Sequence, residues 1–241
     1  MITGASRGIG EAIAQGFAEQ GATVILAARK LDALEIAANA VESKGGVARA
    51  IACHTGKPSQ IESLFNQVES EFGRVDILVN NAATNVHFGP AIEVTEAAFD
   101  KTFEINTKGY FMMAQRAAKT MIEQQSGSII NIASVVGQRT YPGQGIYGMT
   151  KAAVIYMTKM LAEELGPNGI RCNCIAPGLV ETRFASVLVE TEEHHKIFTD
   201  RAALGRHAQP SEMVGAAIFL ASDAASYITG EILSCDGGSL T

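Results

Sequence analysis

Tryptophan is absent from this chain of 241 residues, and Asp, Glu, Lys and Arg together make up only 18% of it. The net charge of -6 leaves no basic field that would hold a nucleic acid or an anionic membrane surface. No apolar run is long enough to span a bilayer, and no cationic leader precedes an apolar stretch. We therefore expect a cytoplasmic protein without nucleic-acid or membrane partners.

Cysteine is also infrequent. The four cysteines, none of them in a CxxC pair or at a spacing typical of zinc ligands, are Cys53, Cys172, Cys174 and Cys235. His194 and His195 are neighbours, so their side chains should point apart, and no third ligand is spaced to join them. We expect reduced thiols and no metal site.

Apolar runs rich in β-branched residues alternate with segments long enough for helices. The runs are 23–28 (TVILAA), 47–53 (VARAIAC), 75–80 (VDILVN), 127–133 (GSIINIA), 170–176 (IRCNCIA) and 230–235 (GEILSC). Nearly continuous apolar strands are typical of a parallel sheet that is covered on both faces. We predict the α/β class: a single-domain Rossmann fold with a doubly wound parallel sheet of about seven strands and helices on both faces.

This domain should span residues 1–241, because 47% of the chain is hydrophobic and no linker interrupts it. A polar stretch at about 181–210 breaks the alternation of strands and helices. We expect it to be a substrate-loop insertion above the carboxyl edge of the sheet.

The opening residues, MITGASRGIG, place three glycines in the spacing TGxxxGxG before a helical pattern. Such a turn lets the backbone approach a pyrophosphate at a helix N-terminus. The cofactor contacts expected here are Gly4, Ser6, Arg7, Gly8, Ile9 and Gly10. Only Met1 and Ile2 precede Thr3, which is too short for a central strand. We therefore expect the natural N-terminus to lie upstream of Met1.

The end of the second strand indicates which dinucleotide is bound. Ala28 stands where an acidic side chain would bind the ribose of NAD. Arg29 and Lys30 follow it, and together with Arg7 they would converge on a 2′-phosphate. This pattern favours NADP(H) over NAD(H), and the alternative is that Arg29 and Lys30 form a solvated strand end.

Four residues form a candidate catalytic group. Tyr147 and Lys151 lie one helical turn apart in YGMTK, so both should project from one face. A nearby ammonium lowers the pKa of a phenol, which then exchanges a proton with a carbonyl or carbinol oxygen. Ser134 ends a strand at the carboxyl edge and would donate to the same oxygen. Asn106 is a poor helix former and should bend its helix and hold a water.

These motifs together resemble the short-chain dehydrogenase/reductase (SDR) family over essentially the whole chain. The matching segments are Thr3 with the glycine turn, NNAA at 80–83, Asn106, Ser134, Tyr147, Lys151, and the Pro-Gly pair at 177–178 with Thr182. The resemblance implies hydride transfer at the nicotinamide C4, with Tyr147 as acid or base and Ser134 positioning the carbonyl. It also implies that Lys151 binds the nicotinamide ribose and that Asn106 anchors a relay water.

The same resemblance implies the remaining cofactor contacts: Asn81, Ala82, Tyr147, Lys151, Pro177, Gly178, Val180 and Thr182. Two positions depart from the family pattern. Ala83 replaces the usual glycine, and His54 replaces an aspartate that contacts adenine in many relatives. The adenine contact is therefore the least defined part of the expected cofactor site.

Local strings such as AARK, CHTGK and VTEAAFDKT are similar to the NADPH-dependent carbonyl reductase branch called dehydrogenase/reductase member 4. That similarity implies a small-molecule carbonyl or alcohol substrate of the ketone or diketone class. One alternative is a 3-oxoacyl-acyl-carrier-protein reductase, although 122–127 (IEQQSG) and 166–169 (GPNG) lack the cations that would bind an acidic carrier. Another is a catalytically lapsed sensor or scaffold, although both Tyr147 and Lys151 are present.

An apolar pocket for this substrate is expected beside the catalytic group. Its candidate contacts are Ser134, Val136, Tyr141, Tyr147, His87 and Phe88, with Val86 and Ile146 nearby. Helices near 99–124 and 147–165 carry more apolar surface than one sheet face requires. The family resemblance implies a homotetramer with these helices at the interface.

Overall fold

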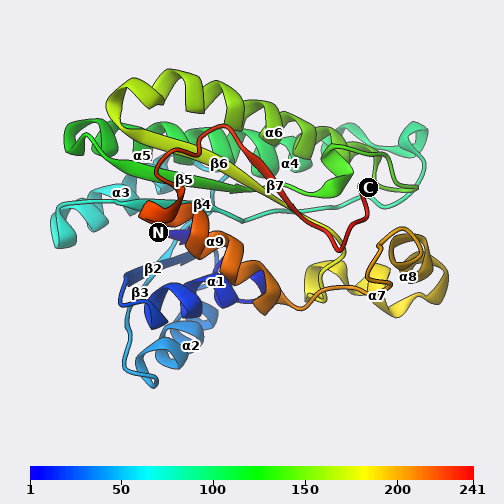
Figure 1. Cartoon of the computed structure of the whole chain (residues 1–241), viewed down its shortest axis with the longest axis horizontal. Helices are drawn as coiled ribbons and strands as arrows, with labels where there is room; N and C mark the ends of the chain where they lie inside the picture. The colour runs from blue at the N-terminus through cyan, green and yellow to red at the C-terminus, as the bar shows by residue number, and fades with distance from the viewer.

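A seven-stranded parallel sheet forms the centre of the computed structural model, which describes all residues 1–241 (Figure 1). The strand order is β3-β2-β1-β4-β5-β6-β7. The strands are β1 (Ile2–Thr3), β2 (Thr23–Ala28), β3 (Val47–Ala52), β4 (Ile77–Asn80), β5 (Gly127–Ile132), β6 (Ile170–Pro177) and β7 (Ile232–Cys235). The predicted doubly wound fold and its strand number are confirmed.

Helices cover both faces of this sheet. They are α1 (Gly8–Glu19), α2 (Leu31–Glu42), α3 (Pro58–Phe72), α4 (Glu96–Phe103), α5 (Gly109–Gln124), α6 (Gly145–Leu165), α7 (Ser186–Glu190), α8 (Glu192–Thr199) and α9 (Val214–Ala221). One apolar cluster includes Phe65, Met113 and Leu161 under α3, α5 and α6. A second cluster includes Ile13 and Leu220 under α1, α2 and α9. The inner strands β4 and β5 are rich in apolar residues because they lie between the two clusters: Leu78 and Ile129 belong to the first, and Val79 and Ile130 belong to the second.

The short first strand lies at the centre of the sheet. Ile2 is fully buried and pairs with Leu26 on one side and Val79 on the other. Met1 extends the hydrogen-bond ladder, since its carbonyl oxygen accepts from Val79 N at 2.8 Å. The expectation that so short a segment cannot be a central strand is therefore wrong, because neighbouring backbone completes the pairing. An upstream natural start stays a prediction.

The direction of winding reverses between β1 and β4, which are neighbours in the sheet but not in the chain. The connections after these two strands leave in opposite directions, so a crevice opens at their carboxyl ends. The glycine turn follows β1, and the NNAA segment follows β4. The fold thus brings two segments that are about 80 residues apart in the sequence to one crevice.

Residues 181–210 connect β6 to the region before α9 and form the short helix η5 (Arg183–Ala185), α7 and α8. In Figure 1 this segment lies in yellow and gold at one end of the molecule. Val180 and Ala208 form a parallel bridge, which brings the two ends of the segment together. None of the helices is both long enough and apolar enough to cross a membrane.

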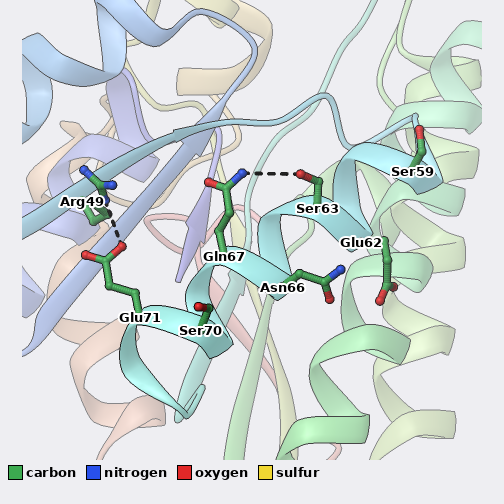
Figure 2. A pocket seen from close by; sticks show the side chains of 8 residues that line it. All are labelled: Arg49, Ser59, Glu62, Ser63, Asn66, Gln67, Ser70 and Glu71. Carbon is green, nitrogen blue, oxygen red and sulfur yellow. Dashed lines mark hydrogen bonds and ion pairs between the residues drawn. The ribbon is translucent and has the colours of Figure 1, made fainter.

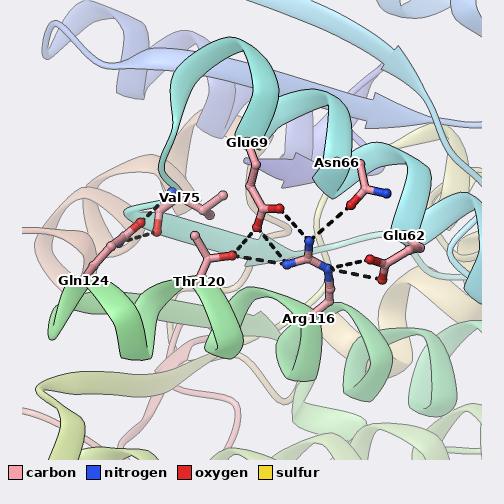
Figure 3. Close-up of polar contacts among 7 residues, drawn as sticks. All are labelled: Glu62, Asn66, Glu69, Val75, Arg116, Thr120 and Gln124. Carbon is pink, nitrogen blue, oxygen red and sulfur yellow. Dashed lines mark hydrogen bonds and ion pairs between the residues drawn. The ribbon is translucent and has the colours of Figure 1, made fainter.

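Helix α3 has one polar side that faces outward and another side that packs against α5. Its outer side carries polar residues that line a shallow hollow with Arg49 of β3 (Figure 2). Its other side meets α5, where the guanidinium of Arg116 binds both carboxylate oxygens of Glu69 at 2.6 and 2.8 Å (Figure 3). Arg116 also donates to Glu62, and Thr120 donates to Glu69. This Arg116 cluster fixes α3 against α5 at the edge of the apolar core.

Candidate active site

The glycine turn after β1 requires glycine at specific positions. Gly4 and Gly8 have φ of 66° and 63°, a left-handed conformation that side chains disfavour. A Cβ on Gly10 would lie 2.5 Å from Asn81 Nδ2 and 2.6 Å from Gly4 O. The backbone of the turn is therefore as close to the segment after β4 as atoms can pack. The N-terminal amides of α1 point from this turn toward the crevice.

Hydrogen bonds lock the NNAA segment onto the same turn. Thr3 Oγ1 accepts from Asn81 N at 2.9 Å and from Ala82 N at 3.1 Å. Asn81 Nδ2 donates to Thr3 O at 2.9 Å and to Gly4 O at 3.3 Å. The glycine turn and the NNAA segment are thus one structural unit.

The segment after β6 forms a third wall of the crevice. A Cβ on Gly8 would lie 3.2 Å from Thr182 Cγ2, so Thr182 packs directly over the glycine turn. Pro177 ends β6, and Gly178 packs closely on the backbone of Asp236. The three predicted cofactor segments therefore surround the N-terminus of α1.

Two cations follow the end of β2, and a third lies in the glycine turn. Arg7, Arg29 and Lys30 are all exposed, and none of them forms an ion pair with an acidic side chain. Ala28 offers no carboxylate to a ribose. Burial lowers the pKa of His54, and the charges of Lys101 and Arg29 add to this effect. This donor set fits a dinucleotide that carries an additional phosphate.

Tyr147 and Lys151 lie in the first two turns of α6 and face the same side. Lys151 is 1% exposed, and its Nζ lies 5.5 Å from the centroid of the Tyr147 ring. Nζ donates to Ile132 O at 2.7 Å and to Tyr110 Oη at 3.2 Å. Burial lowers the pKa of Lys151 to about 7. This lysine therefore changes charge in the neutral pH range.

Tyr147 differs in one respect from the expectation. Burial raises the pKa of its phenol above the ordinary value, the opposite of the expected lowering. Lys151 Nζ directs its hydrogen bonds to Ile132 O and Tyr110 Oη and not to this phenol, and burial is the cause of the shift. The protonated phenol is thus the favoured form in this structure.

Ser134 follows β5 and begins the short helix η3 (Val135–Gly137). Its Oγ accepts from Val136 N at 3.3 Å and lies 3.5 Å from Pro177 O, to which it donates. A Cβ on Gly148 would lie 2.8 Å from Val136 O, so η3 packs against the first turn of α6. Ser134 and Tyr147 are therefore held at the same end of the sheet by elements in direct contact.

Asn106 lies in η2 (Glu104–Lys108), a five-residue π-helix between α4 and α5. The expected departure from a regular helix is thus found. Its side chain does not bond locally but holds Thr84, accepting from Thr84 N and donating to Thr84 O, both at 2.8 Å. It also donates to Thr150 Oγ1 of α6 at 3.2 Å. Asn106 consequently joins the loop after β4 to the helix that carries Tyr147 and Lys151.

The predicted substrate residues differ in burial: some are buried in an apolar cluster, and others lie in a loop. Val136 and Tyr141 are buried in a small apolar cluster, where the Tyr141 ring stacks on Phe198 of α8 at 4.5 Å. The Tyr141 hydroxyl is buried and has no hydrogen-bond partner. His87 instead bonds within its own loop, 3.1 Å from Pro90 O.

Phe88 lies between two segments that flank the crevice. A Cβ on Gly143 would lie 2.9 Å from its ring, and the ring meets His194 edge-on at 4.7 Å. His194 and His195 do point apart, since His195 Nε2 lies 2.9 Å from His207 Nδ1. Val86 is largely exposed, and Ile146 is partly buried.

Three residues of the site were not predicted from the sequence. Phe184 of the 181–210 segment lies 5.7 Å from Tyr147, measured between ring centroids. Gln144 is buried and accepts from Asn85 Nδ2 at 3.1 Å. Tyr110 contacts Lys151, and its position one helical turn after Asn106 is the signal that could have identified it.

Comparisons with known proteins agree with this arrangement. A family model described as enoyl-(acyl carrier protein) reductase matches residues 4–239. Dehydrogenase/reductase SDR family member 4 of Mus musculus is 37% identical over 99% of this chain and 85% of its own length. The 3-oxoacyl-[acyl-carrier-protein] reductase FabG of Thermotoga maritima is 37% identical over 99% of this chain and 96% of its own length.

A solved structure shows the same likeness in three dimensions. It is a gluconate 5-dehydrogenase from Burkholderia cenocepacia in complex with NADP and tartrate, which is 33% identical. The superposition has a TM-score of 0.95 and covers 99% of this chain and 93% of that one.

Proposed function

Because the chain belongs to the short-chain dehydrogenase/reductase family, we propose that it is an NADP(H)-dependent oxidoreductase for small carbonyl compounds. The reaction is a reversible hydride transfer between the nicotinamide C4 and a ketone or secondary alcohol. The observation that carries this proposal is the pair of a partly buried Tyr147 and a fully buried Lys151 on one face of α6, beside the glycine-lined crevice.

NADP(H) supplies the hydride when it is bound. The glycine turn and the α1 N-terminus would hold its pyrophosphate. Three unpaired cations support the phosphorylated form, because Arg7, Arg29 and Lys30 would hold the 2′-phosphate by charge-assisted hydrogen bonds. Other residues that would lie near the cofactor are Ser6, Ile9, Asn81, Ala82, Pro177, Gly178, Val180 and Thr182.

Each catalytic side chain has a task that follows from its surroundings. Ser134 Oγ orients the carbonyl oxygen, and Tyr147 Oη gives it a proton as hydride reaches the carbon. The raised pKa of Tyr147 keeps the phenol protonated, which suits reduction. The Lys151 ammonium stabilises the phenolate that remains. Asn106 holds Thr84 and Thr150 and positions α6 against the loop after β4.

The substrate would enter beneath the 181–210 segment. Phe184 beside Tyr147, and the cluster of Val136, Tyr141 and Phe198, give this side an apolar lining. His87 and Phe88 lie on the opposite loop. An apolar lining of this kind supports a ketone or diketone of medium size.

The main alternative is a 3-oxoacyl-acyl-carrier-protein reductase, which the Thermotoga maritima relative supports. Segments 122–127 and 166–169 touch, since a Cβ on Gly169 would lie 2.5 Å from Gln125 O. Neither segment contains a lysine or an arginine. A free ketone is therefore the better supported substrate class.

We also propose a homotetramer. An apolar hollow between the α4–α5 region and α6 is lined by residues that include Phe103, Phe111, Tyr156, Met157 and Met160. Tyr156 is 73% exposed there.

A cytoplasmic location remains the expectation, which fractionation of cells that express the tagged chain would test.

A cofactor and substrate screen tests the proposal. Oxidation of NADPH, and much less of NADH, should depend on added ketone or diketone. Faster turnover of a carrier-bound 3-oxoacyl substrate would favour the alternative. Binding of NADPH without turnover across the panel would indicate a sensor and contradict the proposed activity.

A further inference from the structure

Tyr110 of α5 is the buried neighbour of Lys151 on the side remote from solvent. It is 1% exposed, and it follows Asn106 by one helical turn. Its Oη lies 3.2 Å from Lys151 Nζ and donates to Ile132 O at 3.1 Å. The phenol therefore stands between a catalytic candidate and the end of β5.

Three polar atoms close into a triangle at this point. Lys151 Nζ donates both to Tyr110 Oη and to Ile132 O, and Tyr110 Oη donates to the same Ile132 O. An ammonium has three N–H groups, and this triangle engages two of them. The third remains free to point toward Tyr147, whose ring centroid lies 5.5 Å from Nζ.

We propose that Tyr110 is a positioning residue that holds the Lys151 ammonium in the direction required for the hydride-transfer chemistry. The inference rests on the proposed function. Tyr110 acts by orientation and not as a proton carrier, because its own hydroxyl proton is directed to Ile132 O, a carbonyl that cannot pass a proton on. Without the phenol oxygen, the ammonium keeps one fixed acceptor and gains rotational freedom.

No group that faces Lys151 carries a negative charge at neutral pH, so the neutral Tyr110 oxygen is one of the few acceptors for its ammonium. The titratable groups are Tyr110 from α5, Cys174 from β6 and Tyr147 from its own helix. Lys151 has no carboxylate ion-pair partner. The burial that lowers the pKa of Lys151 raises that of Tyr110 well above its ordinary value. Tyr110 thus stays a neutral acceptor while Lys151 titrates.

Replacement of Tyr110 by phenylalanine tests this role, because it removes only the hydroxyl. Tyr227→Phe is the matched control, since Tyr227 is fully exposed. With Tyr110→Phe we expect the alkaline limb of the kcat profile to shift down by about half a unit or more. The kcat at neutral pH should fall roughly tenfold, while the carbonyl KM changes less than about twofold.

A measurement without turnover separates this inference from the proposed function. The 13C resonance of Lys151 Cε, assigned by its loss in Lys151→Met, reports the pKa of the ammonium directly. That pKa should be lower in Tyr110→Phe than in the wild type and unchanged in Tyr227→Phe. An unchanged Lys151 pKa together with an unchanged kcat profile would overturn the positioning role while leaving the reductase activity intact.

If Tyr110→Phe does not fold, difluorotyrosine at position 110 keeps the ring and the hydroxyl but weakens the oxygen as an acceptor. The Lys151 pKa should then fall by a smaller amount in the same direction. No shift with this residue would also overturn the proposal. If none of the carbonyl compounds in the panel causes the wild type to oxidise NADPH, the proposed function is wrong, whatever the Lys151 pKa shows.

Discussion

At the residue scale, Lys151 is an ionisable side chain that is completely buried. Its two acceptors are a backbone carbonyl and a phenol, neither of which is anionic at neutral pH. Burial therefore lowers its pKa from the ordinary 10.5 to about 7. Below pH 7 both the folded and unfolded states carry the ammonium, so the fold bears the full cost of burying it. That cost declines between pH 7 and 10.5, as the folded state releases its proton first.

Lys151→Met should abolish turnover and yet stabilise the protein, because it removes a buried charge. The gain in free energy of unfolding should be on the order of 2 kcal/mol larger at about pH 6 than at about pH 9. Urea denaturation at the two pH values measures it. A variant less stable than the wild type at both pH values would show that the ammonium stabilises the fold.

Arg29 is the residue whose removal should change the choice of cofactor. Arg29→Ala should raise the KM for NADPH roughly tenfold, because one charge-assisted hydrogen bond to the 2′-phosphate is lost. The KM for NADH should remain nearly constant. Steady-state kinetics with both cofactors measure this, and Lys44→Ala, which removes an exposed cation beyond α2, is the control. Equal losses with NADPH and NADH would exclude a 2′-phosphate contact.

At the scale of elements, the Arg116 cluster joins two helices through a partly desolvated charge. The Arg116 side chain is 13% exposed, and that of Glu69 is 30% exposed. The hydrogen bonds from Arg116 hold the pKa of Glu69 below its ordinary value of 4.5. Because that pKa is lowered by folding, the stabilisation is present above pH 4.5 and is lost as the pH falls through the folded-state pKa.

Arg116→Met should lower the free energy of unfolding by about 2 to 3 kcal/mol at neutral pH, since Glu69 loses its partner. The difference from the wild type should shrink in acid. Glu62→Gln is the control, because the exposed Glu62 ion pair should contribute less than about 1 kcal/mol. Chemical denaturation measures the free energy of unfolding of both variants. Equal losses would contradict the stabilising role of the Arg116 cluster.

The elements also show what the sequence could predict. Strands such as 75–80 and 127–133 were visible because burial on both faces makes them continuously apolar. The turn at Gly10 could be predicted from the glycine spacing, and the structure gives the reason for that spacing, because only glycine fits beside Asn81. Phe184 and Gln144 were not visible, since their contacts arise only when distant segments pack. The raised pKa of Tyr147 likewise depends on burial, which spacing does not reveal.

At the scale of the whole molecule, the apolar hollow beside α6 bears on assembly. Tyr156 is exposed on the same helix that carries Tyr147 and Lys151 on its inner side. A subunit that covers this hollow would therefore also buttress the catalytic helix.

Tyr156→Glu should reduce the assembly to smaller species, because a charge buried at an interface without a partner is strongly unfavourable. Light scattering coupled to size-exclusion chromatography measures the mass. Tyr227→Glu is the control on a surface outside this hollow and should leave the mass unchanged. A monomeric wild type, or a Tyr156→Glu variant of unchanged mass, would contradict the proposed interface.

We propose that a protonated phenol on α6, oriented with a neighbouring ammonium, delivers the proton that accompanies hydride transfer. Single-turnover oxidation of NADPH by a reactive diketone, compared between the wild type and Tyr147→Phe, tests it most directly. The variant should still bind NADPH, because only the hydroxyl is removed, and should lose at least about a hundredfold in rate. A Tyr147→Phe variant that reduces the diketone at the wild-type rate would show that Tyr147 is not the proton donor.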